Sequence, residues 1–382
     1  MSLRVNPMRH TPTKFSLRLA LTNFLLLSIS VFVGYAICNL LFLLLIRNGN
    51  QDTGFPRSIV SHLPAPLRWG YPSIGTTGGT EDIALLGDSY VEGAGDDYRN
   101  GVADYAITHH LYQKSGLPLV SFGTNGTSLT SQIMLYQLSL DGKFWPMISG
   151  RSEANRPKRI LAFFYEGNDL DNHIAERETG GANSHLNALQ SSRKLQPLRL
   201  FLSNKFKSIQ ITPRDVKPKN GKETLQFTRV CGLDYCRAIR PMQAASPSLD
   251  GQEIQQAINE MIANLRRLES TTNARVCLIY IASPATIYSP DLIKFKQDFL
   301  PNRKTEGTIA GSKNLKRSKD IRSQFKQKLL QTNINFVDST LAFQQEAQRK
   351  FLHGDIDEKH FNTDGNRLLA TTVTNNLNRC FS

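Results

Sequence analysis

Five short apolar runs, separated by longer segments, constrain the fold of this chain more than any other feature. They lie at residues 83–86, 117–122, 160–165, 276–281 and 334–337. Before the fourth run, apolar residues recur at spacings of four and three, as in a helix that buries one face. These residues are Ile254, Ile258, Met261, Leu265 and Leu268. Strands that alternate with helices are typical of a parallel sheet with crossover helices, so the sequence predicts an α/β domain.

A much longer apolar stretch, residues 19–46, precedes this domain. It exceeds the ~20 residues needed to cross a bilayer, and it is too long for the apolar core of about 7 to 15 residues in a cleavable signal peptide. Basic residues are more frequent before the stretch than just after it, where Arg47 stands alone. The positive-inside rule therefore predicts a cytoplasmic tail over residues 1–18 and a single transmembrane helix over 19–46. The rest of the chain is expected on the exocytoplasmic side, in the periplasm.

The part after this stretch divides into a linker and a domain. Residues 47–80 are polar, contain prolines and end in a glycine- and threonine-rich segment, which is typical of a stalk. Residues 81–382 contain all five apolar runs and form the predicted domain. Within it, residues 171–250 show no clear period, and we expect an insertion that serves as a lid or contacts substrate.

The formal charge of +14 raises the question of an anionic partner. Basic residues gather at 193–222 and 294–328, but neither stretch has zinc-finger spacing, a nucleotide-stacking motif or a basic zipper. We therefore expect a solvated basic surface and no nucleic acid. A polyanionic glycan or a lipid headgroup is the functional alternative.

The five cysteines fit an exported domain. Cys38 falls in the predicted membrane helix, while Cys231 and Cys236 are spaced to close a small loop by a disulfide. A metal site there is disfavoured, because no histidine or second cysteine pair lies nearby with ligand spacing. Cys277 lies in an apolar run and is predicted to be a buried thiol.

Polar and glycine residues follow the predicted strands, at the edge of the sheet where open α/β folds bind ligands. Gly87, Asp88 and Ser89 follow the first run, and a segment at 123–127 follows the second. A third group, 167–169, follows the third run, and the segment 357–365 lies between the fifth run and an apolar terminal helix. Each segment is therefore predicted to contribute a different part of one reaction centre.

These four blocks, in this order, resemble those of the SGNH, or GDSL-type, hydrolase superfamily. The resemblance covers most of the predicted domain outside the insertion, and it implies a flavodoxin-like three-layer α/β/α sandwich. It places the nucleophile at Ser89 and an Asp-x-x-His pair at Asp357 and His360. It also implies oxyanion donors at Ser89, Gly126 and Asn168.

The chemistry of these residue types agrees with that assignment. A serine hydroxyl needs a base to take its proton, and the His360 imidazole is suited to this at neutral pH. Asp357, three residues earlier, is able to fix the imidazole tautomer and stabilise the imidazolium. The backbone N–H groups of Ser89 and Gly126 and the Asn168 amide would stabilise the oxyanion. Because side chains and backbone donors suffice, no metal or organic cofactor is predicted.

Other residues near the blocks are predicted to have no catalytic role. Gly123 is interpreted as a position of close backbone approach, and His109, His110, His173 and His353 as surface or packing residues. Tyr90 stands where the family often has leucine, and Phe361 where it often has proline. Neither departure removes a reacting group, so both bear on subfamily and substrate more than on mechanism.

Three functions are compatible with this pattern. The favoured one is a serine esterase that removes O-acyl groups, above all O-acetyl groups, from an exocytoplasmic carbohydrate or glycolipid. The second is an O-acyltransferase that modifies a cell-surface polysaccharide through the same acyl-serine intermediate. The third, which the complete set of reacting groups disfavours, is a non-catalytic glycan-binding protein. The sequence indicates no particular protein partner.

Overall fold

The computed structural model describes eleven stretches of the chain. These are residues 17–48, 74–75, 79–99, 102, 104–140, 156–179, 228–239, 243–288, 292–297, 305–355 and 357–382. Residues 1–16, 49–73 and 180–227, which belong to the predicted tail, linker and insertion, lie outside the described residues.

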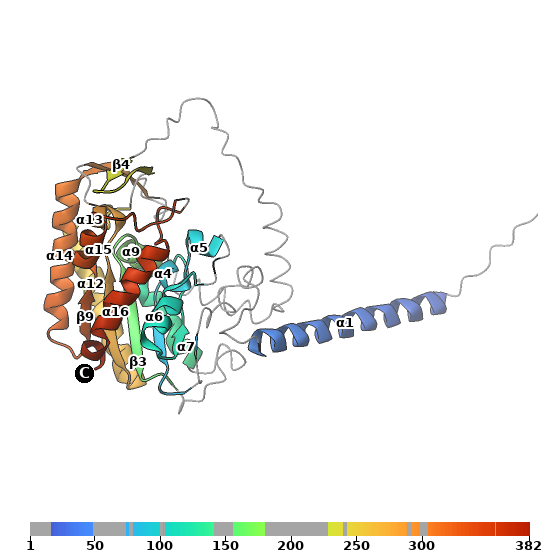
Figure 1. Cartoon of the computed structure of the whole chain (residues 1–382). Coiled ribbons are helices and arrows are strands. Elements are labelled where there is room, and N and C mark those ends of the chain that lie inside the picture. The colour runs from blue at the N-terminus through green and yellow to red at the C-terminus, as the bar shows by residue number, and fades with distance from the viewer. Residues whose placement is uncertain are drawn as a thin grey trace, which may run out of the picture.

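A five-stranded parallel sheet forms the centre of the domain (Figure 1). Its strands are β1 (Ile83–Leu86), β2 (Leu119–Ser121), β3 (Arg159–Tyr165), β6 (Arg275–Ile281) and β9 (Asn335–Asp338), in the order β2-β1-β3-β6-β9. All five predicted strands are therefore confirmed. The inner strands β1, β3 and β6 are buried almost throughout, because helices cover both faces of the sheet. This is why they read as continuous apolar runs in the sequence.

Helices flank the sheet in two groups. The helices of the domain are α4 (Ser89–Glu92), α5 (Asp96–Arg99), α6 (Ile107–Ser115), α7 (Leu129–Leu140), α9 (Asp169–Thr179), α12 (Gly251–Thr272), α13 (Pro284–Tyr288), α14 (Gly311–Leu329), α15 (Thr340–Glu346) and α16 (Thr363–Phe381). Helices in contact with one another form each group: α7, α9, α12 and α14 make up the first, and α6, α15 and α16 the second. The sheet thus carries helical cover from elements that lie far apart in the chain.

The helix predicted from apolar spacing is α12, and its sequence explains both its start and its packing. At its N-terminus the Asp250 carboxylate accepts bonds from the backbone N–H groups of Gln252 and Glu253, while the Glu253 carboxylate accepts from the Asp250 backbone N–H. This reciprocal cap satisfies N–H groups that have no partner within the helix. The five predicted apolar residues are all buried in the core.

The N-terminal apolar stretch forms helix α1 (Leu17–Asn48), drawn in blue in Figure 1. Among the residues that the structure describes, no helix meets the combined length and apolarity needed to span a membrane. The membrane span over 19–46 therefore stays a prediction.

Two small antiparallel hairpins accompany the main sheet. The first pairs β4 (Thr228–Cys231) with β5 (Cys236–Ile239) inside the predicted insertion, and a Cys231–Cys236 disulfide closes it, as the sequence predicted. The second pairs β7 (Leu292–Gln297) with β8 (Thr305–Ala310) and was not predicted. Residues 171–179, also assigned to the insertion, continue helix α9 directly after β3.

The prediction that Cys277 is a free thiol is wrong. Its side chain is buried as expected, but it forms a disulfide with Cys380, which is also buried. The bond joins β6 to the end of α16, and the two cysteines are 103 residues apart. The apolar surroundings of Cys277 were visible in the sequence, whereas the position of α16 against β6 was not.

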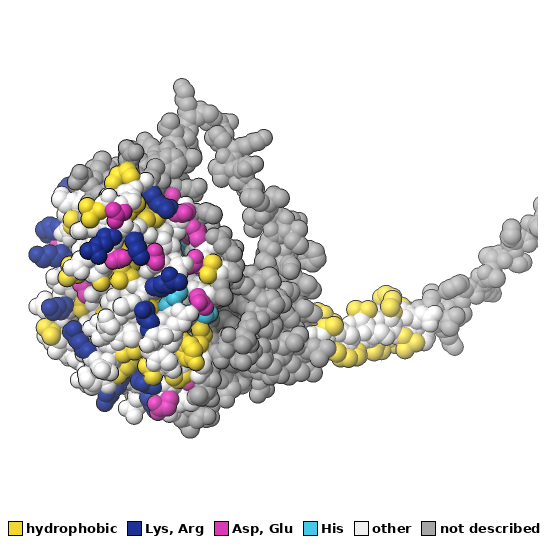
Figure 2. All heavy atoms as spheres, in the orientation of Figure 1, with side chains coloured by type: hydrophobic (Ala, Val, Ile, Leu, Met, Phe, Trp, Pro, Cys, Tyr) yellow, Lys and Arg dark blue, Asp and Glu magenta, His cyan; other side chains and the backbone are white. Residues whose placement is uncertain are grey.

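Basic side chains are spread over the surface. On the face shown in Figure 2, Lys and Arg lie among Asp and Glu and do not gather in one patch. Helix α14, which contains most of the basic stretch 294–328, exposes Lys313, Lys316 and Lys319. The other basic stretch, 193–222, lies outside the described residues.

Candidate active site

Ser89 lies in a tight turn between the end of β1 and the start of α4. Gly87 permits this turn, because a Cβ there would lie 2.4 Å from the Val91 side chain. The Asp88 carboxylate caps α4 by accepting a bond from the Tyr90 backbone N–H at 3.0 Å. Helix α4 ends at Gly93, whose φ of 83° is a left-handed conformation that favours glycine. Ser89 is thereby held, nearly buried, at the carboxyl edge of the sheet.

His360 and Asp357 reach Ser89 from the other end of the domain. The His360 Nε2 atom lies 2.8 Å from the Ser89 Oγ atom. The His360 Nδ1 atom lies 2.9 Å from the Asp357 Oδ1 atom, a hydrogen-bond distance, although the two groups are not aligned as a hydrogen bond. Catalytic contacts of this kind often tighten only when substrate binds. The three side chains therefore form a continuous serine–histidine–aspartate series.

A second carboxylate lies close to the serine. The Ser89 hydroxyl is 3.3 Å from Asp88 Oδ2, which is farther than its distance to His360. Burial raises the pKa of Asp88, and bonds from the Tyr90 backbone and from the Ser89 and Asn168 side chains offset this only in part. His360 Nε2 is therefore the nearer of the two groups that face the Ser89 hydroxyl.

Asn168 follows β3 and lies beside Asp88. Asn168 is 7% exposed, and its side chain is among the neighbouring groups that lower the pKa of Asp88 and so offset part of the effect of burial. The turn that carries it is fixed by Asp169, whose Oδ2 atom accepts a bond of 2.7 Å from the Tyr165 backbone N–H. The structure thus brings Ser89 and Asn168 to one edge of the sheet through a shared neighbour.

Gly126 lies in the loop between β2 and α7. Its φ is 75°, its backbone is exposed, and a Cβ there would meet open space. No hydrogen bond joins Gly126 to Ser89 or Asn168 within the described residues. Gly126 is therefore accessible in the structure and has no hydrogen bond to Ser89 or Asn168 among the described residues.

Neighbouring side chains hold this loop in place. The Asn125 backbone N–H donates to Glu92 at 2.6 Å, and the Ser128 backbone N–H donates to Glu176 at 2.9 Å. At Gly123, a Cβ would lie 2.2 Å from the Glu92 backbone nitrogen, which confirms the predicted close approach. The loop is therefore fixed both to α4 and to α9.

The match to a known protein family decides what kind of site this is. The family model of GDSL-like lipases and acylhydrolases matches residues 83–373, which is most of the chain. The chain belongs to this family. It is a GDSL-type hydrolase that acts on esters, and the resemblance stated from the sequence is confirmed at this level.

Solved structures similar to this GDSL-type hydrolase are distant. A catalytic mutant of Axe2, an acetylxylan esterase from Geobacillus stearothermophilus, is 12% identical, with 78% of this chain and 94% of that chain covered and a TM-score of 0.35. A putative lipolytic protein of the G-D-S-L family from Desulfitobacterium hafniense DCB-2 is 11% identical, with coverage of 77% and 98% and a TM-score of 0.33. The lipase Lip_vut3 from a goat rumen metagenome is 14% identical, with coverage of 79% and 97% and a TM-score of 0.36. No curated protein matches the chain.

Two of the histidines predicted to have no catalytic role, His173 and His353, have polar side-chain partners in the structure. His173 Nε2 lies 2.6 Å from Glu260, and His353 Nδ1 lies 2.8 Å from the Tyr288 hydroxyl. Burial lowers the pKa of His353 to about 3, so this ring is neutral at physiological pH. Within the described residues, no group of three or more His, Cys, Asp or Glu side chains is placed to hold a metal ion.

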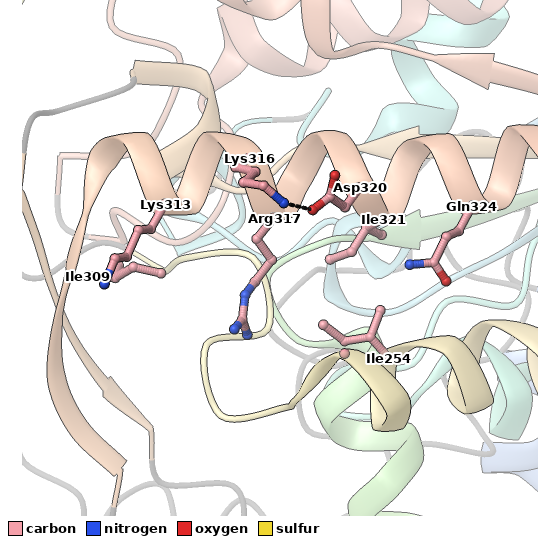
Figure 3. A pocket seen from close by; sticks show the side chains of 9 residues that line it. Ile254, Ile309, Lys313, Lys316, Arg317, Asp320, Ile321 and Gln324 are labelled. Carbon is pink, nitrogen blue, oxygen red and sulfur yellow. Dashed lines mark hydrogen bonds and ion pairs between the residues drawn. The ribbon is translucent and has the colours of Figure 1, made fainter.

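A hollow away from these residues is shown in Figure 3. It lies between α12 and α14, with Ile254 on one wall and Lys313, Lys316 and Arg317 on the other. Lys316 pairs with Asp320 at 2.8 Å, and Arg317 donates to the Ser246 and Leu249 backbone oxygens. These cationic groups are therefore largely engaged within the protein. None of the predicted catalytic residues lines this hollow.

Proposed function

We propose that this hydrolase cleaves O-acyl esters through an acyl-serine intermediate formed on Ser89. The observation that carries the proposal is the 2.8 Å contact between Ser89 Oγ and His360 Nε2, continued by the 2.9 Å contact between His360 and Asp357. Ser89 attacks the ester carbonyl while His360 takes its proton, and Asp357 stabilises the imidazolium. His360 then gives that proton to the leaving alcohol. Water, activated by the same imidazole, releases the acid and regenerates the serine.

The negative oxygen that develops during both steps needs fixed donors. We assign this role to the backbone N–H groups of Ser89 and Gly126 and to the Asn168 side-chain amide. The Asn168 amide nitrogen would be the donor, since the Oδ1 oxygen of this side chain can only accept a hydrogen bond. At Gly126 an added Cβ would meet no atom within 4 Å, so there is room for a substrate beside this backbone.

The proposed substrate is an O-acyl ester, with O-acetyl favoured, on a carbohydrate or glycolipid outside the cytoplasm. This part of the proposal rests on the predicted N-terminal anchor. A domain tethered to the outer face of a membrane meets glycans and glycolipids there. A polysaccharide O-acyltransferase would use the same acyl-serine and differs only in the acceptor, which is a sugar hydroxyl in place of water.

The proposed anchor is residues 19–46 of α1. The large apolar side chains described along this helix are exposed, for example Phe24 at 70% and Phe32 at 66%. Figure 2 shows apolar side chains at the surface of this helix. These exposed apolar side chains are unfavourable in water, which supports their burial in an apolar environment such as a membrane. We place the N-terminus in the cytoplasm and the hydrolase domain in the periplasm, following the basic residues before the helix.

Turnover of p-nitrophenyl acetate by the full-length chain in mild detergent tests the mechanism. Ser89→Ala should abolish hydrolysis and labelling by an activated phosphonate, with the label on wild-type protein located at residue 89 by mass spectrometry. Ser115→Ala is the matched control, because its hydroxyl bonds the Leu111 backbone oxygen away from the site. Wild-type turnover in Ser89→Ala would refute the proposed nucleophile.

Adding an oligosaccharide acceptor to the same assay separates the two reactions. An esterase releases free acetate at a rate that the acceptor does not change. Strong acceptor-dependent transfer with little hydrolysis would instead establish the acyltransferase.

The anchor and its orientation have their own test. A reporter that is active only in the periplasm, fused to the C-terminus, should be active, and alkaline carbonate should leave the chain in the membrane fraction. An inactive reporter, or release by carbonate, would contradict the topology and remove the support for a glycan substrate.

A further inference from the structure

The segment that carries Asp357 and His360 lies outside the sheet and has limited internal bonding. Its backbone bonds run from Gly354 N–H to His360 oxygen at 3.0 Å, from His360 N–H to Asp357 oxygen at 3.2 Å, and from Asn362 N–H to Leu352 oxygen at 3.1 Å. These bonds define the turn itself. They do not determine where the turn sits relative to Ser89, and proton transfer between Ser89 and His360 depends on that distance.

The segment directly after Ser89 makes the missing connections. The Tyr90 hydroxyl donates to the Lys359 backbone oxygen at 2.5 Å, one residue before His360. The Asp96 carboxylate accepts a bond of 2.8 Å from the Asp357 backbone N–H. Both bonds span more than 260 residues of sequence, and both join the nucleophile side of the site directly to the base side.

Packing around these bonds leaves little freedom. The Tyr90 ring lies 5.4 Å from the His360 ring and 4.8 Å from the Phe361 ring, the latter edge-on. At Gly354, a Cβ would lie 2.7 Å from the Asp96 carboxyl carbon, so the turn closes directly onto this carboxylate. Burial raises the pKa of Tyr90 well above its usual value of 10, so the hydroxyl keeps the proton that it donates.

We propose that Tyr90 and Asp96 are positioning residues that hold His360 and Asp357 at reacting distance from Ser89. Tyr90 is covalently next to the nucleophile, so its bond to Lys359 fixes the base relative to the serine. Asp96 fixes the backbone of Asp357, and through it the carboxylate that orients the imidazole. The proposal rests on the proposed acyl-serine mechanism and extends it to two residues that do not touch the substrate.

Tyr90→Phe tests the first bond, because it keeps the ring and removes only the hydroxyl. In p-nitrophenyl acetate hydrolysis by the full-length chain, kcat should fall by about tenfold, while KM stays within about twofold. Tyr235→Phe is a matched control, since the Tyr235 hydroxyl also donates to a backbone oxygen, that of Ala347, at 2.5 Å. This control removes a similar bond that holds neither Ser89 nor the segment with Asp357 and His360, and it should keep the wild-type kcat.

Asp96 is tested by comparing two substitutions. Asp96→Ala removes the acceptor of the Asp357 N–H bond and should lower kcat, again with little change in KM. Asp96→Asn keeps a side-chain oxygen in place and should hold kcat at least about fivefold above that of Asp96→Ala. Thermal melts accompany all four variants, and if Asp96→Ala does not fold, the tyrosine pair decides the proposal.

The proposal is overturned if Tyr90→Phe retains kcat within about twofold of wild type, or if Tyr235→Phe loses as much. Equal losses in Asp96→Ala and Asp96→Asn would overturn the role of Asp96 as a hydrogen-bond acceptor. Failure of the underlying function has a different signature, namely wild-type chain with no more turnover than Ser89→Ala, and it would remove the positioning role as well.

Discussion

A buried carboxyl group beside the site gives the sharpest prediction about stability. Glu166 follows β3, two residues before Asn168, and is fully buried. Its carboxylate accepts bonds of 3.0 Å from the Ser283 backbone N–H and from the Thr286 hydroxyl. Burial nevertheless dominates and raises the pKa of Glu166 from 4.5 to about 7. Folding therefore favours the protonated form of this group.

The sign and size of the effect follow from that pKa. Because the folded pKa lies above the unfolded value, the stabilising contribution is complete below about pH 4.5 and is lost as the pH rises through about 7. A change in pKa from 4.5 to about 7 corresponds to about 3 kcal/mol of unfolding free energy. Glu166→Gln places a neutral amide of the same size at this position and removes the titration. The variant should lose about 2.5 kcal/mol less than wild type between pH 5 and pH 8.5, because a small part of the effect has already been lost at pH 5.

Urea unfolding followed by far-ultraviolet circular dichroism, at pH 5, 6, 7, 8 and 8.5, measures this difference. Thr286→Val is a control that should make stability depend more strongly on pH, whereas Glu166→Gln should make it depend less. It removes a hydrogen bond that favours the charged form, so the pKa of Glu166 should rise further and the loss of stability with pH should become larger. Parallel losses in wild type and Glu166→Gln would show that burial does not keep this group protonated.

Three further predictions concern the site and its scaffold. Asn168→Ala should lower kcat by about 10²- to 10³-fold in the p-nitrophenyl acetate assay while circular dichroism stays unchanged, and a loss below about tenfold would argue against an oxyanion role. Cys380→Ala opens the disulfide to Cys277, which closes a loop of 103 residues, and should lower the unfolding free energy by about 3 to 5 kcal/mol in urea titrations. Gly123→Ala places a Cβ 2.2 Å from the Glu92 backbone nitrogen, so both the melting temperature and kcat should fall. Unchanged values would mean that the loop can move to make room for the added methyl group.

The parts of the fold that the sequence predicted are those with local signals. Strands covered on both faces must be apolar throughout, so β1, β3 and β6 stood out as runs. The apolar spacing of α12 reflects packing of one helical face against the core. The four blocks were found because parallel strands all end at the same edge, where Ser89 and Asn168 indeed lie close together.

The parts that were not predicted depend on contacts between distant segments. The strand order β2-β1-β3-β6-β9 and the Cys277–Cys380 disulfide are examples, because neither leaves a pattern in the neighbouring residues. The β7–β8 hairpin is another example, because most of it lies in residues 294–328, which the sequence analysis interpreted as a solvated basic surface. Tyr90 was noticed only as a departure from leucine, and Asp96 carried no local signal. Their bonds to Lys359 and Asp357 become visible only when the ends of the domain are brought together.

This dependence on distant contacts explains how a short C-terminal segment is placed so accurately. His360 is followed directly by α16, and α16 packs against α6, β6 and β9 and is tied to β6 by the disulfide. The segment is thus held in two ways: the packing of α16 holds its C-terminal end against the core, and Tyr90 and Asp96 hold it close to Ser89. Substitutions that weaken one or the other should therefore be distinguishable, because loss of the disulfide lowers stability first and loss of the Tyr90 hydroxyl lowers kcat first.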